Sequence, residues 1–65
     1  MLRFKVEGMS CGHCVAAVTR ALQVLDPGAQ VEVDLAGGEV RVQTQRDAEQ
    51  VLQAIREEGY AAEPA

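Results

Sequence analysis

The chain has 65 residues, which suffices for one small domain, residues 1–65, and leaves no room for a second. Ten acidic and six basic residues give a net charge of −4, which argues against nucleic-acid binding because such proteins present a basic face. With one Phe and one Tyr, the chain also lacks an aromatic surface on which bases could stack.

The N-terminal stretch MLRFKVEG carries charges at positions 3, 5 and 7, whereas a signal peptide needs a continuous apolar stretch there. No apolar run approaches the ~20 residues that a membrane helix requires, so we expect no membrane insertion. We therefore expect a cytoplasmic protein. In that reducing compartment its two cysteines should be thiols.

A strand and a helix are predicted first. Apolar and charged residues alternate from Leu2 to Glu7, which predicts a strand with one buried face, and Gly8 ends it. From Val15 to Leu25 the apolar residues have helical spacing instead. The turn formed by residues 26–28, Asp-Pro-Gly, stops this helix.

Two strands joined by a hairpin come next. Apolar residues alternate with acidic ones from Val31 to Leu35, and with polar ones from Val40 to Gln43. Residues 36–38, Ala-Gly-Gly, favour a tight turn between them because such turns require positive φ.

A second helix and a short strand complete the chain. Asp47 is a predicted helix N-cap with Gln50 as its capping-box partner, and Gly59 suits the left-handed position that stops a helix. The apolar stripe of this helix consists of Ala48, Val51, Leu52 and Ile55. Residues 60–64 are long enough for a short last strand. Because this tail is short and weakly apolar, we expect the strand to be frayed.

The predicted order of elements is β-α-β-β-α-β. Each strand–helix unit crosses over and returns to the sheet with right-handed connectivity. The sequence thus predicts an α+β fold of the ferredoxin-like kind. In this sandwich a four-stranded antiparallel sheet carries both helices on one face.

The chemistry-bearing segment is Cys11-Gly12-His13-Cys14, in the loop after the first strand and at the start of the first helix. Backbone N–H groups and the positive end of the helix dipole favour thiolate at such a position. Thiolate is the reactive form for disulfide exchange and for metal ligation alike. The electrostatics therefore leave both functions open.

The first function is that of a thiol-disulfide oxidoreductase, because CGHC is also the redox motif of protein disulfide isomerases. The rest of the chain argues against it. A thioredoxin-like domain needs about 100 residues, and the chain is shorter. Ser10 stands where those enzymes carry an aromatic residue, and neither Pro27 nor Pro64 is placed as the cis-proline beside the motif. We therefore expect a protein that is not an enzyme.

The second function is metal binding. A closed structural zinc site needs four ligands, and the chain has two cysteines and one histidine. Two thiolates instead suit a soft ion that tolerates low coordination, above all Cu(I), and mercury, silver or zinc is the alternative cargo. A net charge of −1 on such a complex would be offset by the helix N-terminus.

With Gly8, Met9, Cys11 and Cys14, the chain matches the pattern Gly-Met-x-Cys-x-x-Cys in the first strand–helix loop. It resembles a heavy-metal-associated domain of the small bacterial copper-chaperone type over essentially its whole length. A His before the second Cys and a Tyr after the Gly that ends the second helix, here Tyr60, are similar to those chaperones as well.

The resemblance implies Cu(I) held by Cys11 and Cys14. It also implies stepwise thiolate exchange with the metal-binding domain of a copper-transporting P-type ATPase. A copper-responsive regulator is a further candidate partner. The expected state is a monomer, with a metal-bridged homodimer as a side state. An excised domain of a transporter would have nearly the same sequence.

Three further residues each have a structural and a functional interpretation. Met9 anchors the loop in the core, or adds a thioether ligand. His13 is a solvated residue that helical spacing points outward, or it tunes the thiols and transiently occupies a third coordination position. Tyr60 covers the edge of the core, or it shields a sulfur with its hydroxyl.

Overall fold

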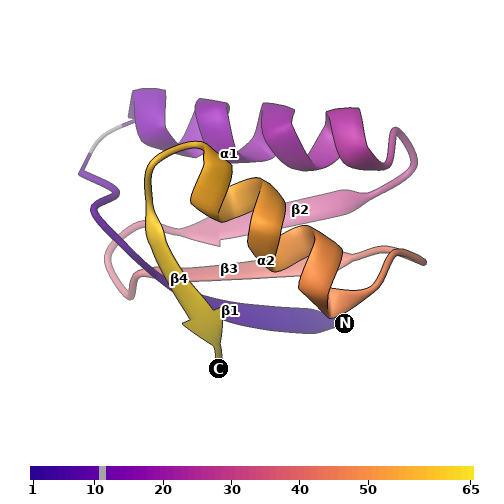
Figure 1. Cartoon of the computed structure of the whole chain (residues 1–65). Helices are drawn as coiled ribbons and strands as arrows, with labels where there is room; N and C mark the ends of the chain where they lie inside the picture. Colours follow the sequence, from indigo (N-terminus) through magenta and orange to yellow (C-terminus); the bar gives the residue numbers. More distant parts are fainter. Residues whose placement is uncertain (11) are drawn as a thin grey trace.

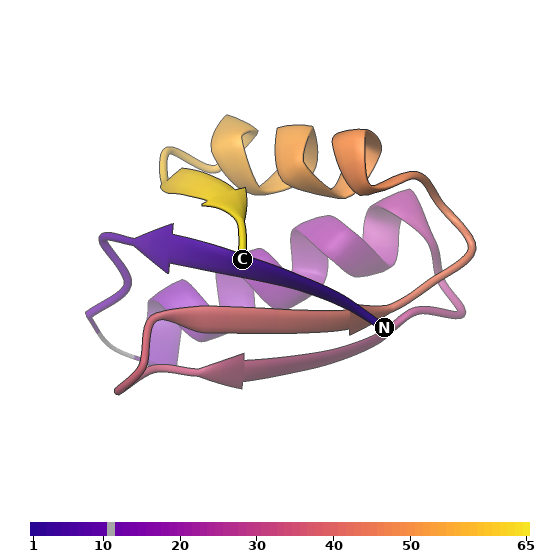
Figure 2. The ribbon, with the colours of Figure 1, turned by 90° about the horizontal axis from the view of Figure 1, so that it is seen from below.

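The computed structural model describes residues 1–10 and 12–65, and Cys11 lies outside the described part. Its elements in chain order are β1 (Leu2–Glu7), α1 (Gly12–Leu25), β2 (Gln30–Asp34), β3 (Glu39–Gln43), α2 (Ala48–Glu57) and β4 (Ala61–Pro64). The strands form one antiparallel sheet in the order β2-β3-β1-β4. Figures 1 and 2 show both helices on the same face of this sheet. The predicted ferredoxin-like fold is confirmed.

The core lies between the sheet and the two helices. Its members are Phe4, Val6, Val18, Leu22, Ala29, Val40, Val42, Val51, Leu52, Ile55 and Ala62. The register explains why the strands contribute alternate residues: Phe4 pairs with Val40, and Val6 with Ala62, so all four point to the helix face. The charged residues between them therefore lie on the open face of the sheet.

Helix α1 begins at Gly12, three residues before the apolar periodicity starts at Val15. Val18 and Leu22 are its buried residues, whereas Val15 and Leu25, at the two ends of the predicted stripe, are half-buried. The earlier start matters for the site because it includes Cys14 in the first turn of the helix.

Helix α2 begins as its capping residues predict. The Asp47 backbone N–H donates to Gln50 Oε1 at 3.3 Å, which is one half of the expected capping box. Gly59 follows the C-cap with φ of +95°, the left-handed conformation expected of it. Ala48 was wrongly assigned to the apolar stripe. It is exposed at the first position of α2, and the buried face of this helix begins three residues later at Val51.

The hairpin between β2 and β3 shows one further difference. Strand β2 ends at Asp34, so Leu35 belongs to the turn and not to the strand, and the residue is 38% exposed. The turn begins early because Asp34 Oδ1 accepts the backbone N–H of Gly37 at 3.0 Å. Gly38 then takes the positive φ that the sequence predicted for this turn.

The last strand, β4, pairs with β1 along its whole length, from Ala61 opposite Glu7 to Pro64 opposite Phe4. The prediction that this strand is frayed was therefore wrong. Its apolar contribution is small, with Ala62 as its one buried residue, but Arg56 reinforces it. The Arg56 guanidinium donates two hydrogen bonds, at 3.1 and 2.9 Å, to the carbonyl of Ala62 on this edge strand. In the part of the chain that the structure describes, neither helix is long and apolar enough to span a bilayer.

Candidate metal site

Gly8 and Met9 determine the path of the segment that leads from β1 to α1. Gly8 has φ of +94°, which turns the chain sharply out of the sheet. The next residue, Met9, is half-buried and packs against the core. The interpretation of Met9 as an anchor is thereby confirmed, and a metal-binding role for its sulfur stays a prediction.

Cys14 is the third residue of α1 and is half-buried. The first turn of this helix contains no acidic residue that would compete for its positive end. The dipole and the N–H groups of that turn therefore favour a thiolate at Cys14 over a thiol. The other predicted ligand, Cys11, lies outside the described residues, three positions earlier in the sequence.

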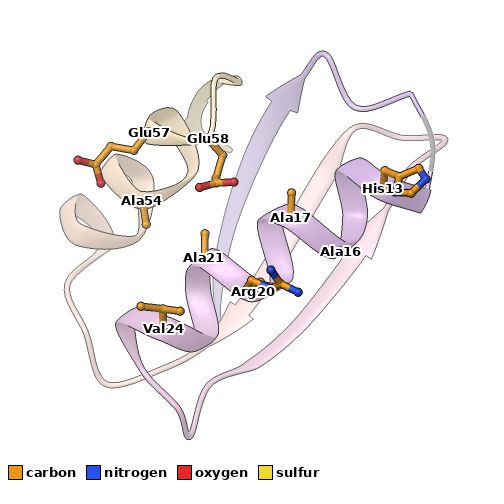
Figure 3. A pocket seen from close by; sticks show the side chains of 9 residues that line it. All are labelled: His13, Ala16, Ala17, Arg20, Ala21, Val24, Ala54, Glu57 and Glu58. Carbon is orange, nitrogen blue, oxygen red and sulfur yellow. The ribbon is translucent and has the colours of Figure 1, made fainter.

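His13 precedes Cys14 in the same turn of α1 and is exposed, as its helical spacing predicted. Figure 3 places its imidazole at one end of a groove between α1 and α2. His13 is thus accessible to a molecule that approaches the start of α1. Its role in tuning the thiols stays a prediction.

Tyr60 lies beside the start of the same segment although 52 residues separate it from Gly8. The pairing of Ala61 with Glu7 sets Tyr60 next to Gly8. A Cβ atom added to Gly8 would lie 3.5 Å from Tyr60 Cδ1, so the ring is in van der Waals reach. The half-buried ring packs against the core as well. Its interpretation as a cover for the core edge is confirmed, and a contact between its hydroxyl and sulfur stays a prediction.

The remaining titratable residues do not assemble into a second metal site. Among residues 1–10 and 12–65, no group of three or more His, Cys, Asp and Glu side chains is arranged to hold a metal ion. Met9, His13, Cys14 and Tyr60 are therefore the described residues from which a site at the start of α1 can be built. They come from the β1–α1 segment, α1 itself and the α2–β4 turn.

Comparison with known proteins decides the family. The sequence profile of the heavy-metal-associated domain matches residues 3–61. The chain belongs to this family. The match spans both cysteines and four of the six elements completely. It begins at the second residue of β1 and ends at the first residue of β4.

Relatives of this heavy-metal-associated protein include the copper chaperone CopZ of Staphylococcus aureus (strain bovine RF122 / ET3-1). The two are 45% identical over 58 residues, which cover 85% of each chain. The copper chaperone Atx1 from Synechocystis PCC6803 is similar in structure, with 35% identity and a TM-score of 0.93 over 97% of this chain and 100% of that one. A gold binding protein is 31% identical, with a TM-score of 0.94 over all of both chains.

Sequence reasoning missed two features around the site. The contact between the Tyr60 ring and Gly8 depends on the pairing of β1 with β4, which no local pattern encodes. The groove between α1 and α2 depends on how the helices pack. A signal for it exists in the small residues of α1, since Ala16, Ala17 and Ala21 line this groove.

Proposed function

We propose that this heavy-metal-associated protein is a copper chaperone of the cytoplasm that carries one Cu(I) between the thiolates of Cys11 and Cys14. The observation that supports this most is the position of Cys14 in the first turn of α1, where the helix end stabilises a thiolate. The copper-chaperone relatives support the same ion.

The chemistry of the donors favours Cu(I) over the alternative ions. Two soft thiolates complete a linear Cu(I) complex, whereas Zn²⁺ prefers four ligands and would need two from elsewhere. Silver and mercury ions are also soft and would compete for the same pair. Copper is preferred to them here because two of the three similar proteins named above are copper chaperones, whereas the third is a gold binding protein.

Cu(I) bound by two thiolates has an incomplete coordination shell, which allows its transfer to another protein. A third thiolate can bind Cu(I) before either original Cu–S bond breaks, so the ion passes between proteins without being released. The proposed acceptor is the metal-binding domain of a copper-transporting P-type ATPase, and a copper-responsive regulator is a second one. The ion is cargo, and the protein performs no chemical transformation of a substrate.

A Cu(I) titration under anaerobic conditions, with a chromophoric Cu(I) chelator as competitor, tests the proposal. The wild-type protein should bind one Cu(I), and Cys11→Ser and Cys14→Ser should each lower the affinity by orders of magnitude because each removes a soft ligand. Ser10→Ala changes an exposed residue of the same segment and serves as the matched control. Unchanged affinity in either cysteine variant would refute the assignment.

The competing function, thiol-disulfide exchange by the CGHC pair, needs its own test because both functions use the same cysteines. The metal-free protein should not turn over a disulfide substrate, since the family match favours metal binding. Catalytic turnover that is lost in both cysteine variants and unaffected by Ser10→Ala would favour the oxidoreductase instead.

A further inference from the structure

A second cleft adjoins the groove that ends at His13, and it lies where the last turn of α1 meets the exposed side of α2. Its volume is about 370 Å³. We call it the distal cleft, because Leu25 in its wall is the last residue of α1 and lies about 16 Å along that helix from Cys14. The residues that line it are Leu25, Glu49, Gln50, Gln53, Ala54 and Glu57.

The inside of the distal cleft is apolar. Leu25 and Ala54 are half-buried, pack against the core and form its floor. Val24, the neighbour of Leu25 on α1, is 78% exposed, and Figure 3 shows it at the end of α1 opposite to His13. Apolar side chains of a partner that cover this floor are removed from water together with it, which favours binding.

The rim of the distal cleft is acidic. Glu49 and Glu57 are exposed, and among residues 1–10 and 12–65 no Lys, Arg or His lines the cleft. In the same part of the chain the ion pairs are those of Arg41 with Glu32 and Glu39, so neither rim carboxylate has a cation beside it. The two rim positions are eight residues apart on α2, which separates them by about 12 Å along the helix axis.

An apolar floor between two carboxylates fits a basic amphipathic helix of another protein. Apolar side chains of such a helix cover the floor, and two Lys or Arg side chains about two turns apart span the ~12 Å between Glu49 and Glu57. A second copy of this chain does not fit. Each of its helices carries a single Arg and no Lys, and Arg56 already donates to the Ala62 carbonyl.

We propose that the distal cleft docks a basic amphipathic helix of a partner protein, with or without a bound metal ion. This inference goes beyond the proposed function, because neither cysteine takes part in the contact. A helix bound in the cleft leaves the Cys14 end of α1 accessible. The protein therefore stays attached to its partner while copper is exchanged at the opposite end of α1. The cleft is small, so the contact is weak and reversible.

A synthetic helix tests the proposal. The peptide has about 18 residues of Ala, Gln and Leu with two Lys about two turns apart, and the Leu side chains lie between the Lys on the same face. It is titrated at low salt into isotope-labelled protein, metal-free and Cu(I)-loaded, and the amide signals are followed by NMR. The amides of Leu25, Glu49 and Ala54 should shift, those of Gly12 and His13 should not, and both forms should give the same dissociation constant.

Two control peptides test the helix and the charges separately. A peptide with Pro in place of a central Ala keeps both Lys but cannot form a continuous helix, so it should not bind. A peptide with Glu in place of both Lys keeps the apolar face, and it should not bind to the wild-type protein because like charges then face each other.

Charge reversal on the protein locates the contact. Glu49→Lys/Glu57→Lys should raise the dissociation constant for the Lys peptide about tenfold or more, and it should gain binding of the Glu peptide. Glu32→Lys/Glu63→Lys is the matched control. It makes the same change of net charge, from −4 to 0, on exposed residues of the sheet, and it should retain most of the affinity.

Any of four results would overturn the proposal: no binding of the Lys peptide, equal binding by both double variants, equal binding of the Pro peptide, or binding only with Cu(I). Shifts at Gly12 and His13 in place of the cleft amides would do so too. Cleft amides that shift with protein concentration alone would assign the cleft to a second copy. Because the metal-free protein is sufficient for the test, each of these results leaves the proposed function intact.

Discussion

Gly8 is the residue at which the chain leaves β1 and turns toward the candidate metal site. Glycine adopts its φ of +94° without steric strain, whereas in a residue with a Cβ atom this backbone conformation is strained. The space around it is sufficient, since an added Cβ would meet Tyr60 at an ordinary contact distance of 3.5 Å. The constraint on this position is therefore conformational.

Gly8→Ala should lower the free energy of unfolding by about 1–2 kcal/mol because the left-handed backbone is strained for alanine. Gly12→Ala is the matched control. It lies four residues on in the first turn of α1, where an added Cβ meets nothing within 4 Å and alanine favours the helix. Urea unfolding of both variants checks this. Equal stability of Gly8→Ala and the wild type would show that the conformation of Gly8 imposes no such constraint.

Strand β4 is supported by a side chain from the preceding helix. It has four residues, lies at the edge of the sheet, and contributes Ala62 as its one buried residue. The carbonyl of Ala62 accepts both hydrogen bonds from Arg56 on α2. Arg56 thus connects the edge strand to the helix that precedes it and supports the turn that holds Tyr60.

Arg56→Gln should therefore lower the free energy of unfolding by about 1 kcal/mol and increase hydrogen exchange in β4. Arg20→Gln, an equivalent change at an exposed residue of α1, should leave β4 unaffected. Amide exchange resolved by NMR distinguishes the two variants. Protection of β4 in Arg56→Gln equal to that of the wild type would contradict this role of Arg56.

The end of α1 is held to the β3–α2 loop by Asp26. Its carboxylate accepts a hydrogen bond from the Thr44 hydroxyl and another, at 3.1 Å, from the Gly28 backbone N–H. The Thr44 hydroxyl, followed by the Gly28 N–H, lowers the pKa of Asp26 from its ordinary value of 3.8. This contact lies at the end of α1 opposite to Cys14.

A lowered pKa in the folded state fixes the sign of the pH dependence. The Asp26 contact stabilises the fold fully above the ordinary pKa of the carboxyl, and this contribution disappears as pH falls through the lower folded pKa. Thr44→Ala should therefore be less stable than the wild type at neutral pH, and the difference should shrink in strong acid. Urea unfolding from pH 7 to pH 2 measures this, and a difference that grows toward low pH would contradict it.

At the scale of the whole molecule, the fold was predictable because period-two and helical patterns alternate without conflict along the chain. The same reasoning placed Cys14 near a helix start and His13 on an exposed face. It failed at Leu35, where the side chain of Asp34 begins the turn early. It also failed at Ala48, which continues the apolar stripe in sequence but is exposed as the first residue of α2.

The remaining features could not be predicted from local patterns. The contact between the Tyr60 ring and Gly8, and the hydrogen bonds from Arg56 to Ala62, join segments that only the order of strands brings together. The groove between α1 and α2 depends on the packing of two helices that are separate in sequence. Periodicity shows which face of a helix is buried, but not which helix it meets.

The central claim is that the protein passes Cu(I) to another protein by thiolate exchange, and the rate of that transfer tests it most directly. Copper-loaded protein is mixed anaerobically with rising concentrations of a second two-cysteine heavy-metal-associated domain. The amide signals of Gly12 and His13 are followed by NMR. The account predicts transfer that is far faster than spontaneous dissociation, at a rate that rises with acceptor concentration. A rate that is independent of acceptor concentration and equal to the spontaneous off-rate would contradict it.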